Sequence, residues 1–302
     1  MSKNQKHTLR GVVPAIVTPM KEDGEISFSL LEKQAQYLKD VGVHGLFVCG
    51  GTGEGAYLSI EEKKEVYKCV RNVVGHDLFI CLAAISSNTH SALKEIDAFS
   101  DLDPDFLVST TPYYHGADQN VILEHYRRVI EHSFAPVIVY NIPSATANPI
   151  ALETILTLSE MDNVAGVKDS SGDFCQFSRG LFGPRKEGFS WIQGEDYLAA
   201  PALLCGANGV VTGLSNARAE AFVEMYNASV AGDTATVARC QAKINVLYKI
   251  VPVGGFKNGN AGIKAVGELA GRGSRYMRQP GLTLSDEQMR RIAAVMEEYD
   301  AL

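Results

Sequence analysis

The sequence predicts an α/β fold, a (β/α)8 TIM barrel with a C-terminal helical extension. Short apolar runs of the kind that form buried strands alternate with longer amphipathic segments of helical period. Eight such pairs fit within residues 1–230, and their alternation implies a parallel sheet covered by helices. Residues 231–302 carry only helical patterns. We therefore expect a barrel domain with the active site over residues 1–230 and a helical extension over residues 231–302.

Eight short runs rich in branched aliphatic residues supply the predicted strands, and turn-forming residues bound them. In chain order, the predicted strands cover residues 12–17, 43–49, 78–84, 106–109, 137–141, 164–168, 189–193 and 209–212.

The predicted helices follow the strands in turn, beginning with residues 28–41, whose apolar residues recur at helical spacing. The second starts after Ser59, a favoured N-cap residue whose capping-box partner Glu62 lies three residues on. Pro149 marks the start of the helix after the fifth strand, because proline suits a first helical turn. The other helical segments are 89–100, 119–132, 174–181, 197–204, 217–229, 234–250, 261–269 and 285–299.

Composition narrows the class of protein. The 302 residues are 46% hydrophobic, which is enough for one large core. A net charge of −7 argues against nucleic acid as a partner, since phosphate binding needs a basic patch. No run approaches the roughly 18 apolar residues of a membrane span, so no membrane association is expected.

Cysteine and histidine usage predicts a cytoplasmic protein without a metal. The six cysteines are scattered, with no C-x-x-C pair, and the polar N-terminus has no apolar secretion segment. We therefore expect reduced thiols in the cytoplasm. The seven histidines form no H-x-H or H-x-x-E-H pattern, so no metal site is expected.

One lysine stands out among the predicted strand ends, where barrels of this kind place their chemistry. Lys168 is the only lysine or arginine that ends one of the eight strands. Partial burial lowers the pKa of a lysine, and its neutral amine can attack a ketone to form a Schiff base. Tyr140 ends the neighbouring strand and could carry protons. The alternative is that Lys168 pairs with Asp169 or another carboxylate and only closes the rim.

The turn Gly50–Gly55, with the sequence GGTGEG, has three interpretations. Its backbone N–H groups and the Thr52 hydroxyl suit a carboxylate or a phosphate. The pattern G-x-G-x-x-A could instead mark a dinucleotide site, but the acidic partner expected at the end of the third strand is lacking, since Asp77 precedes that strand. A purely structural glycine turn is also open.

Further loop residues are open to a structural as well as a functional interpretation. Tyr113 and Tyr114 could be aromatic residues of a subunit interface. Ser170 and Asp196 follow the sixth and seventh strands and could contact a substrate or serve as helix N-caps.

These motifs together resemble a known family. The stretches GVVPAIVTPM, GGTGEG, TPYY, YNIPS and GVKDSSGD occur in the order and spacing of the dihydrodipicolinate synthase / N-acetylneuraminate lyase family, over nearly the whole chain. Members of this family are class I aldolases that form a Schiff base.

The resemblance implies a role for each matching residue. Lys168 would form an imine with pyruvate or a longer 2-keto acid, and Tyr140 would be the general acid and base. Tyr114 would reach across a dimer interface into the neighbouring site, within a homotetramer built of two dimers. The imine carries the chemistry, so no cofactor is expected. The residues assigned to substrate binding are Gly51, Thr52 and Gly53 at the carboxylate, Val211 at the pocket floor, and Ser170, Gly194 and Asp196.

Two departures from the synthase pattern bear on the substrate. Gly51 stands where synthases usually have a threonine that links two tyrosines, and Ala145 stands where they have an arginine for aspartate semialdehyde. We therefore predict a lyase that cleaves or forms the C–C bond between pyruvate and an aldehyde, acting on a 2-keto-3-deoxy sugar acid. The alternatives are a keto-deoxy-sugar-acid dehydratase, a 4-hydroxy-tetrahydrodipicolinate synthase with an altered site, and a non-catalytic sugar-acid-binding relative, against which the retained Lys168 and Tyr140 argue.

Overall fold

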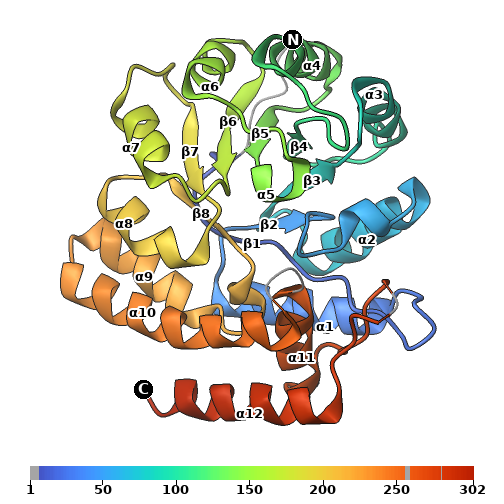
Figure 1. Ribbon diagram of the computed structural model, residues 1–302, viewed down its shortest axis with the longest axis vertical. Coiled ribbons are helices and arrows are strands. Elements are labelled where there is room, and N and C mark those ends of the chain that lie inside the picture. The colour runs from blue at the N-terminus through green and yellow to red at the C-terminus, as the bar shows by residue number, and fades with distance from the viewer. Residues whose placement is uncertain (1–6, 256–258, 280) are drawn as a thin grey trace. The chain divides into compact units, whose positions relative to one another are not determined.

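Eight strands alternate with helices along the chain of the computed structural model, which describes residues 7–255, 259–279 and 281–302 (Figure 1). All eight predicted strands are present within two residues of the expected starts, although the first and second are shorter than predicted. The strands are β1 (Gly11–Pro14), β2 (Gly45–Val48), β3 (Phe79–Ala84), β4 (Phe106–Thr110), β5 (Val137–Asn141), β6 (Val164–Asp169), β7 (Ser190–Gln193) and β8 (Gly209–Thr212).

The strands form one sheet whose order closes on itself. The order is β1-β8-β7-β6-β5-β4-β3-β2, and the pairs from β3 to β8 are parallel. β1 and β2 are joined by a parallel bridge between Ala15 and Phe47 and by the bond from the His44 N–H to the Val12 carbonyl, 2.9 Å. This order confirms the predicted (β/α)8 barrel.

The helices follow the predicted positions closely. Ser59 caps its helix in a capping box with Glu62, as the sequence predicts. Within the described ranges, no helix is both long and apolar enough to cross a bilayer. The α-helices are α1 (Phe28–Val41), α2 (Ile60–Val74), α3 (Thr89–Ala98), α4 (Gln119–His132), α5 (Pro143–Thr146), α6 (Leu152–Ser159), α7 (Phe174–Phe182), α8 (Ala199–Leu204), α9 (Glu220–Ala231), α10 (Thr234–Leu247), α11 (Gly259–Leu269) and α12 (Asp286–Asp300), and the 3₁₀ turns are η1 (Gly55–Tyr57), η2 (Asp196–Leu198), η3 (Leu214–Asn216) and η4 (Tyr248–Gly254).

The segment after β5 differs from the prediction. Instead of one helix starting near Pro149, the chain forms the short α5 and then α6, which starts at Leu152. The break lies at Ala147, which adopts a left-handed conformation with φ of 58°. The Ile150 N–H then donates to the Asn141 side chain, 3.0 Å away, so this backbone group is satisfied outside a helix.

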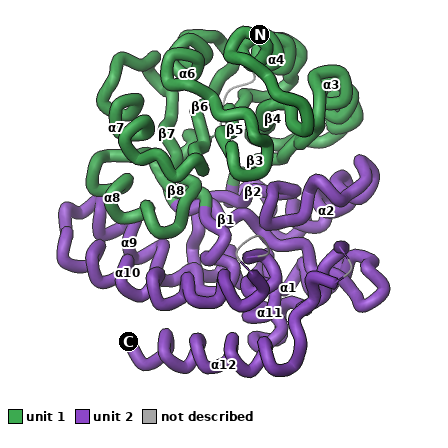
Figure 2. Tube along the Cα trace, in the orientation of Figure 1, with its two compact units in different colours: residues 1–11, 79–211 green, residues 12–78, 212–302 purple. Residues whose placement is uncertain are grey.

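The described chain consists of two compact units (Figure 2). Unit 1 comprises residues 1–11 and 79–211, and unit 2 comprises residues 12–78 and 212–302. In unit 1, the Trp191 ring packs edge-on against Phe177, 5.5 Å between centroids. In unit 2, Phe47 and Phe222 are fully buried. The predicted division at residue 230 stays a prediction.

A buried histidine holds the end of β4 in unit 1. His125, on α4, is 1% exposed. Its Nε2 lies 3.1 Å from the Thr110 carbonyl, which can only accept, so Nε2 carries the proton. Its Nδ1 then accepts from the Thr89 hydroxyl, 3.0 Å away. Burial lowers the pKa of His125 to about 4, against a weaker opposing effect of the Thr110 carbonyl.

We predict that this histidine makes the protein less stable in mild acid. Its pKa is about 4 in the folded chain and 6.5 as a model value, so the unfolded state binds more protons between these pH values. Stability is therefore fully present above pH 6.5, and the free energy of unfolding should fall by about 3 kcal/mol as the pH drops toward 4. Urea unfolding at a series of pH values measures this slope.

In the His125→Gln variant, the loss of about 3 kcal/mol between pH 6.5 and pH 4 should disappear. Glutamine can bond to the Thr110 carbonyl but does not titrate. The control is His90→Gln, which removes an exposed histidine of the same unit and should keep the slope of the wild type. An unchanged slope in His125→Gln would assign the acid sensitivity to other groups.

Candidate active site

The strand register brings the predicted nucleophile and the predicted proton carrier together in unit 1. Tyr140 on β5 is the direct lateral neighbour of Lys168 on β6. Laterally paired residues of parallel strands point to the same face of the sheet. The Lys168 Nζ lies 3.9 Å from the centre of the Tyr140 ring, and both residues are 4% exposed. An amine and a phenol therefore share one buried place, as predicted.

The residues that follow Tyr140 and Lys168 point to the opposite face of the sheet and bond the two strand ends together. Asn141 and Asp169 are also lateral neighbours. Asp169 Oδ1 accepts from the Ser171 N–H at 2.7 Å, and Oδ2 accepts from the Asn141 amide at 3.4 Å. Burial raises the pKa of Asp169, although these bonds oppose that effect. The Asp169 carboxylate thus serves this loop, and the alternative that Lys168 pairs with Asp169 or another carboxylate stays open.

A buried tyrosine of α4 fixes the ends of β4 and β5 at one level. The Tyr126 hydroxyl donates to the Ser109 carbonyl at 2.9 Å and lies 3.4 Å from the Tyr140 carbonyl. Burial raises the pKa of Tyr126, so the hydroxyl stays a donor. This contact supports the position of Tyr140 from behind.

The loop after β7 is fastened to the end of β6. The Gly194 N–H donates to the Asp169 carbonyl at 2.7 Å, and the Ser170 hydroxyl donates to the Gly194 carbonyl at 3.2 Å. A Cβ on Gly194 would lie 2.1 Å from Ser170 Oγ, so this approach requires glycine. Gly194 and Ser170, both predicted substrate contacts, thus have a clear structural role.

The N-cap alternatives for Ser170 and Asp196 are wrong. The N-cap of α7 is Asp173, whose side chain accepts from the Gln176 N–H at 2.9 Å. Asp196 is the first residue of η2, not its cap. The N-cap lies three residues after Ser170, because the chain first turns through Gly172, whose φ is 76°.

Glu195 is a candidate site residue that sequence reasoning missed. Burial raises the pKa of Glu195, while the positive charge of Lys168 and a hydrogen bond from Tyr197 oppose the rise. Its carboxyl group therefore lies within the electrostatic reach of Lys168. The sequence feature that could have identified Glu195 is its place in the loop after β7, between the predicted site residues Gly194 and Asp196.

In unit 2, the turn Gly50–Gly55 contains two kinds of glycine. A Cβ on Gly55 would lie 1.7 Å from the Cys49 carbonyl oxygen, and one on Gly53 would lie 2.8 Å from that of Ile16. These glycines are required by close backbone contacts. A Cβ on Gly51 would meet nothing within 4 Å, and Gly51 is exposed. The fold therefore does not require glycine at position 51.

The other predicted site residues are found at the surface or in the sheet. Tyr114 is 89% exposed, its ring stands edge-on to His115 at 5.0 Å, and its φ of 81° is unusual for a non-glycine residue. Thr52 is half-buried, and Val211 lies in β8 and is 3% exposed.

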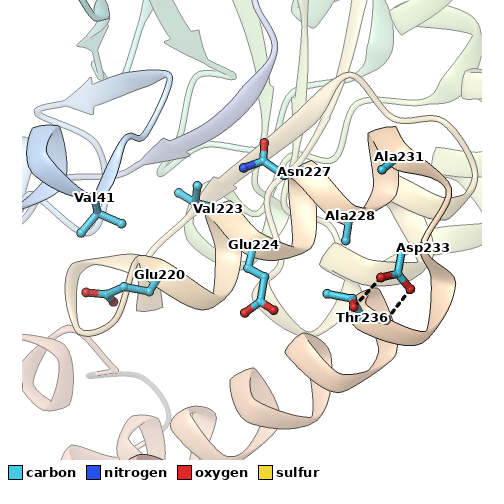
Figure 3. Close-up of a pocket in the computed structure, with 9 residues that line it drawn as sticks. All are labelled: Val41, Glu220, Val223, Glu224, Asn227, Ala228, Ala231, Asp233 and Thr236. Carbon is cyan, nitrogen blue, oxygen red and sulfur yellow. Dashed lines mark hydrogen bonds between the residues drawn. The ribbon is translucent and has the colours of Figure 1, made fainter.

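A hollow of about 680 Å³ in unit 2 contains none of the predicted site residues (Figure 3). It is lined by α9, the start of α10 and Val41 of α1, and each of its three carboxylates has a partner. Glu220 accepts from the Tyr37 hydroxyl, Glu224 pairs with Arg239, and Asp233 caps α10. In the part of the chain that the structure describes, no group of three or more histidine, cysteine or acidic side chains could hold a metal ion.

Known proteins resemble this chain over nearly its whole length. The model of the dihydrodipicolinate synthetase family matches residues 8–299. The 4-hydroxy-tetrahydrodipicolinate synthase of Methanothrix thermoacetophila is 32% identical over 293 residues, covering 97% of this chain and 98% of that protein. The solved dihydrodipicolinate synthase of Thermotoga maritima has a TM-score of 0.90 at 25% identity and covers 98% of this chain and 100% of that one.

A third relative shares the fold. A variant of the Sulfolobus solfataricus 2-keto-3-deoxygluconate aldolase, solved with L-2-keto,3-deoxy-galactonate, has a TM-score of 0.86 at 22% identity and covers 96% of each chain. The predicted family is confirmed by the match over residues 8–299, and with it the enzyme class, a lyase that works through a lysine Schiff base. The chain belongs to the dihydrodipicolinate synthetase family of class I aldolases.

Proposed function

We propose that Lys168 is the Schiff-base nucleophile of a pyruvate-dependent aldolase and that Tyr140 is its general acid and base. One observation carries this proposal, the distance of 3.9 Å between the Lys168 Nζ and the Tyr140 ring centre, where both residues are buried. Lys168 is the penultimate residue of β6 and pairs with Tyr140 on β5 and Ile192 on β7, so its backbone is held on both sides.

The first step is imine formation with a 2-keto acid. The neutral Lys168 amine attacks the keto carbon, and the resulting carbinolamine loses its hydroxyl as water to give a protonated imine. Tyr140 would supply the proton that lets the hydroxyl leave. Family resemblance assigns the substrate carboxylate to Thr52 and the N–H groups of Gly51 and Gly53, and the open position at Gly51 is compatible with that role.

The second step breaks or forms the C–C bond. For a 2-keto-3-deoxy acid, Tyr140 takes the proton of the C4 hydroxyl, the C3–C4 bond breaks, and its electron pair moves into the imine to form an enamine. The aldehyde leaves, C3 takes up a proton, and water releases pyruvate and the free Lys168 amine. The condensation is the same sequence in reverse.

For the aldehyde partner, we propose a polyhydroxy compound, so that the substrate is a 2-keto-3-deoxy sugar acid. Ala145 is exposed on α5 and offers no charge for a second carboxylate. Ser170 and Asp196 follow β6 and β7, and Glu195 adds a carboxyl group within reach of the Lys168 charge. Such polar groups suit substrate hydroxyls better than an apolar aldehyde. A dehydratase acting on the same acids would use the same imine.

The second candidate is the synthase reaction of the named relatives. The Methanothrix thermoacetophila relative is a 4-hydroxy-tetrahydrodipicolinate synthase and matches 97% of this chain. This candidate needs the chain to bind aspartate semialdehyde without the arginine that Ala145 replaces. The departures at Gly51 and Ala145 are the reason that we rank it second.

We also propose a homotetramer of two dimers in the cytoplasm, with Tyr114 at the tight dimer interface. An aromatic ring that is 89% exposed on a left-handed backbone is unusual in an isolated chain. Burial against a partner would account for both features. Sedimentation velocity of the wild-type protein and of Tyr114→Ala measures this assembly.

We predict that pyruvate and borohydride modify Lys168. Reduction of the imine should add the mass of pyruvate less one water plus two hydrogens, and the peptide that contains Lys168 should carry it. Intact mass followed by digestion gives the site. The Lys168→Ala variant should form no adduct and lose its activity.

The matched control is Lys186→Ala, which removes a surface lysine of the same unit that pairs with Asp162. It should keep both the adduct and the activity. A wild-type protein without an adduct, or an active Lys168→Ala variant, would refute the Schiff-base mechanism.

We predict that Tyr140→Phe lowers kcat by about 10²–10⁴-fold, the usual contribution of a general acid or base. Phenylalanine keeps the ring beside Lys168, so the fold and the final amount of trapped adduct should be preserved while the adduct forms more slowly. Stopped-flow assays of pyruvate release and timed borohydride quenching measure the two rates. A Tyr140→Phe variant with unchanged kcat would transfer the proton role to another group.

We predict that the substrate choice depends on positions 51 and 145. The wild-type protein should release pyruvate from at least one member of a panel of 2-keto-3-deoxy sugar acids and should be a poor catalyst with aspartate semialdehyde. Because both positions are open, the double variant Gly51→Thr/Ala145→Arg should fold. Its kcat/KM ratio for aspartate semialdehyde over the best sugar acid should rise about tenfold or more, as expected for a new charged pair. Synthase activity in the wild type that exceeds every sugar-acid activity would establish the second candidate instead.

A further inference from the structure

One face of α11, in the C-terminal part of unit 2, grips the Gly50–Gly55 turn at two points. The Asn260 side-chain amide donates to the Gly51 carbonyl at 3.0 Å. One helical turn later, the Lys264 Nζ donates to Glu54 Oε1 at 2.5 Å. Residues four apart lie on the same face of a helix. We call Asn260 and Lys264 the α11 clamp.

The Lys264 contact of the α11 clamp is an ion pair that is fully shielded from water. The side chains of Lys264 and Glu54 are 0% and 1% exposed. Burial lowers the pKa of Lys264, whereas the Glu54 charge raises it. The second Glu54 oxygen accepts from the Arg278 N–H at 2.9 Å, so both oxygens are engaged. Without water to compete, such a pair has one well-defined geometry.

The turn needs this support because its backbone is strained at the same residue. Glu54 adopts a left-handed conformation with φ of 57°. Non-glycine residues keep such a conformation only where the surroundings impose it. The bonds from Lys264 and Arg278 impose it here, while the Thr18 hydroxyl holds the Gly53 carbonyl at 2.7 Å.

Charge gives the pair a second consequence. Glu54 follows Thr52 by two residues, and an uncompensated carboxylate there would repel a substrate carboxylate. Lys264 neutralises the buried Glu54 carboxylate, which leaves the N–H groups of the turn to set the local field.

We propose that Asn260 and Lys264 are positioning residues, which hold the Gly51–Gly53 segment in the shape and charge state that binds the carboxylate of the 2-keto acid. This inference rests on the proposed function, because it assumes that the turn holds that carboxylate. It gives the C-terminal extension a direct part in substrate affinity through the carbonyl of Gly51 and the side chain of Glu54.

The first experiment compares pyruvate trapping in Asn260→Ala and the wild type. The pyruvate concentration for half-maximal trapping should rise about three- to tenfold, the effect of one lost hydrogen bond, while the trapping rate at saturating pyruvate stays unchanged. In Lys264→Met the rise should exceed tenfold. The control is Glu268→Gln on α11, which breaks the 2.6 Å ion pair of Glu268 with Arg275, a residue that follows the helix. It should match the wild type.

Lys264→Met leaves Glu54 buried and unpaired, and this variant could fail to fold for that reason alone. The double variant Glu54→Gln/Lys264→Met removes both charges and should fold. Its half-saturation should lie between those of the wild type and Lys264→Met, because repulsion is gone but the turn is held less firmly. If Asn260→Ala and the double variant both reach half-maximal trapping at the same pyruvate concentration as the wild type, the positioning role of Asn260 and Lys264 is wrong.

A second measurement does not depend on activity. Hydrogen exchange of the peptide that contains residues 50–58 should be faster in Asn260→Ala and in the double variant than in the wild type and Glu268→Gln. Unchanged exchange would overturn the positioning role even if pyruvate trapping were weakened in these variants. A different outcome is possible, in which exchange is faster in the variants but the wild-type protein forms no pyruvate adduct. That outcome would overturn the proposed function, while α11 would still be shown to hold the turn in place.

Discussion

The proposed chemistry depends on one lateral contact, that of the Lys168 amine with the face of the Tyr140 ring. An ammonium group that loses its water needs compensation, and the negative face of an aromatic ring provides about 2 kcal/mol when both are desolvated. The contact exists because β5 and β6 pair with Tyr140 opposite Lys168. A shift of the register by one residue would turn the lysine to the other face of the sheet. The proposed mechanism therefore depends on the register of these two strands.

The same strand ends use their alternate residues to secure that register. Asn141 and Asp169 point away from the Tyr140–Lys168 face and bond to each other and to the following loops. On β4, Ser109 and the Thr110 carbonyl take bonds from Tyr126 and His125 of α4. Each of these buried polar groups would cost free energy if it were unpaired. The network therefore resists any slip of the strands that would move Lys168 away from Tyr140.

The sequence predicted what depends on local pattern and failed where distant contacts decide. Alternation of strands and helices, the capping box at Ser59, and the places of Tyr140 and Lys168 follow from spacing along the chain, and the structure has them. The break between α5 and α6 was missed because it depends on a bond from the Ile150 N–H to Asn141. The pairing of Glu54 with Lys264 joins residues 210 positions apart, and no local pattern indicates it. The sequence allows an N-cap role for Ser170, because the partner of its hydroxyl, the Gly194 carbonyl, lies on another loop and cannot be read from the local pattern.

The two positions on which we base the proposed choice of aldehyde, Gly51 and Ala145, are positions that the fold leaves free. Gly53 and Gly55 are fixed by backbone oxygens less than 3 Å from any added Cβ, so the turn cannot lose them. Gly51 has no such neighbour, and Ala145 is exposed on α5. A change at either position does not disturb the strand register that holds Lys168 beside Tyr140. Under the proposed function, a change of aldehyde would therefore act on Gly51 and Ala145 while the imine chemistry at Lys168 is kept.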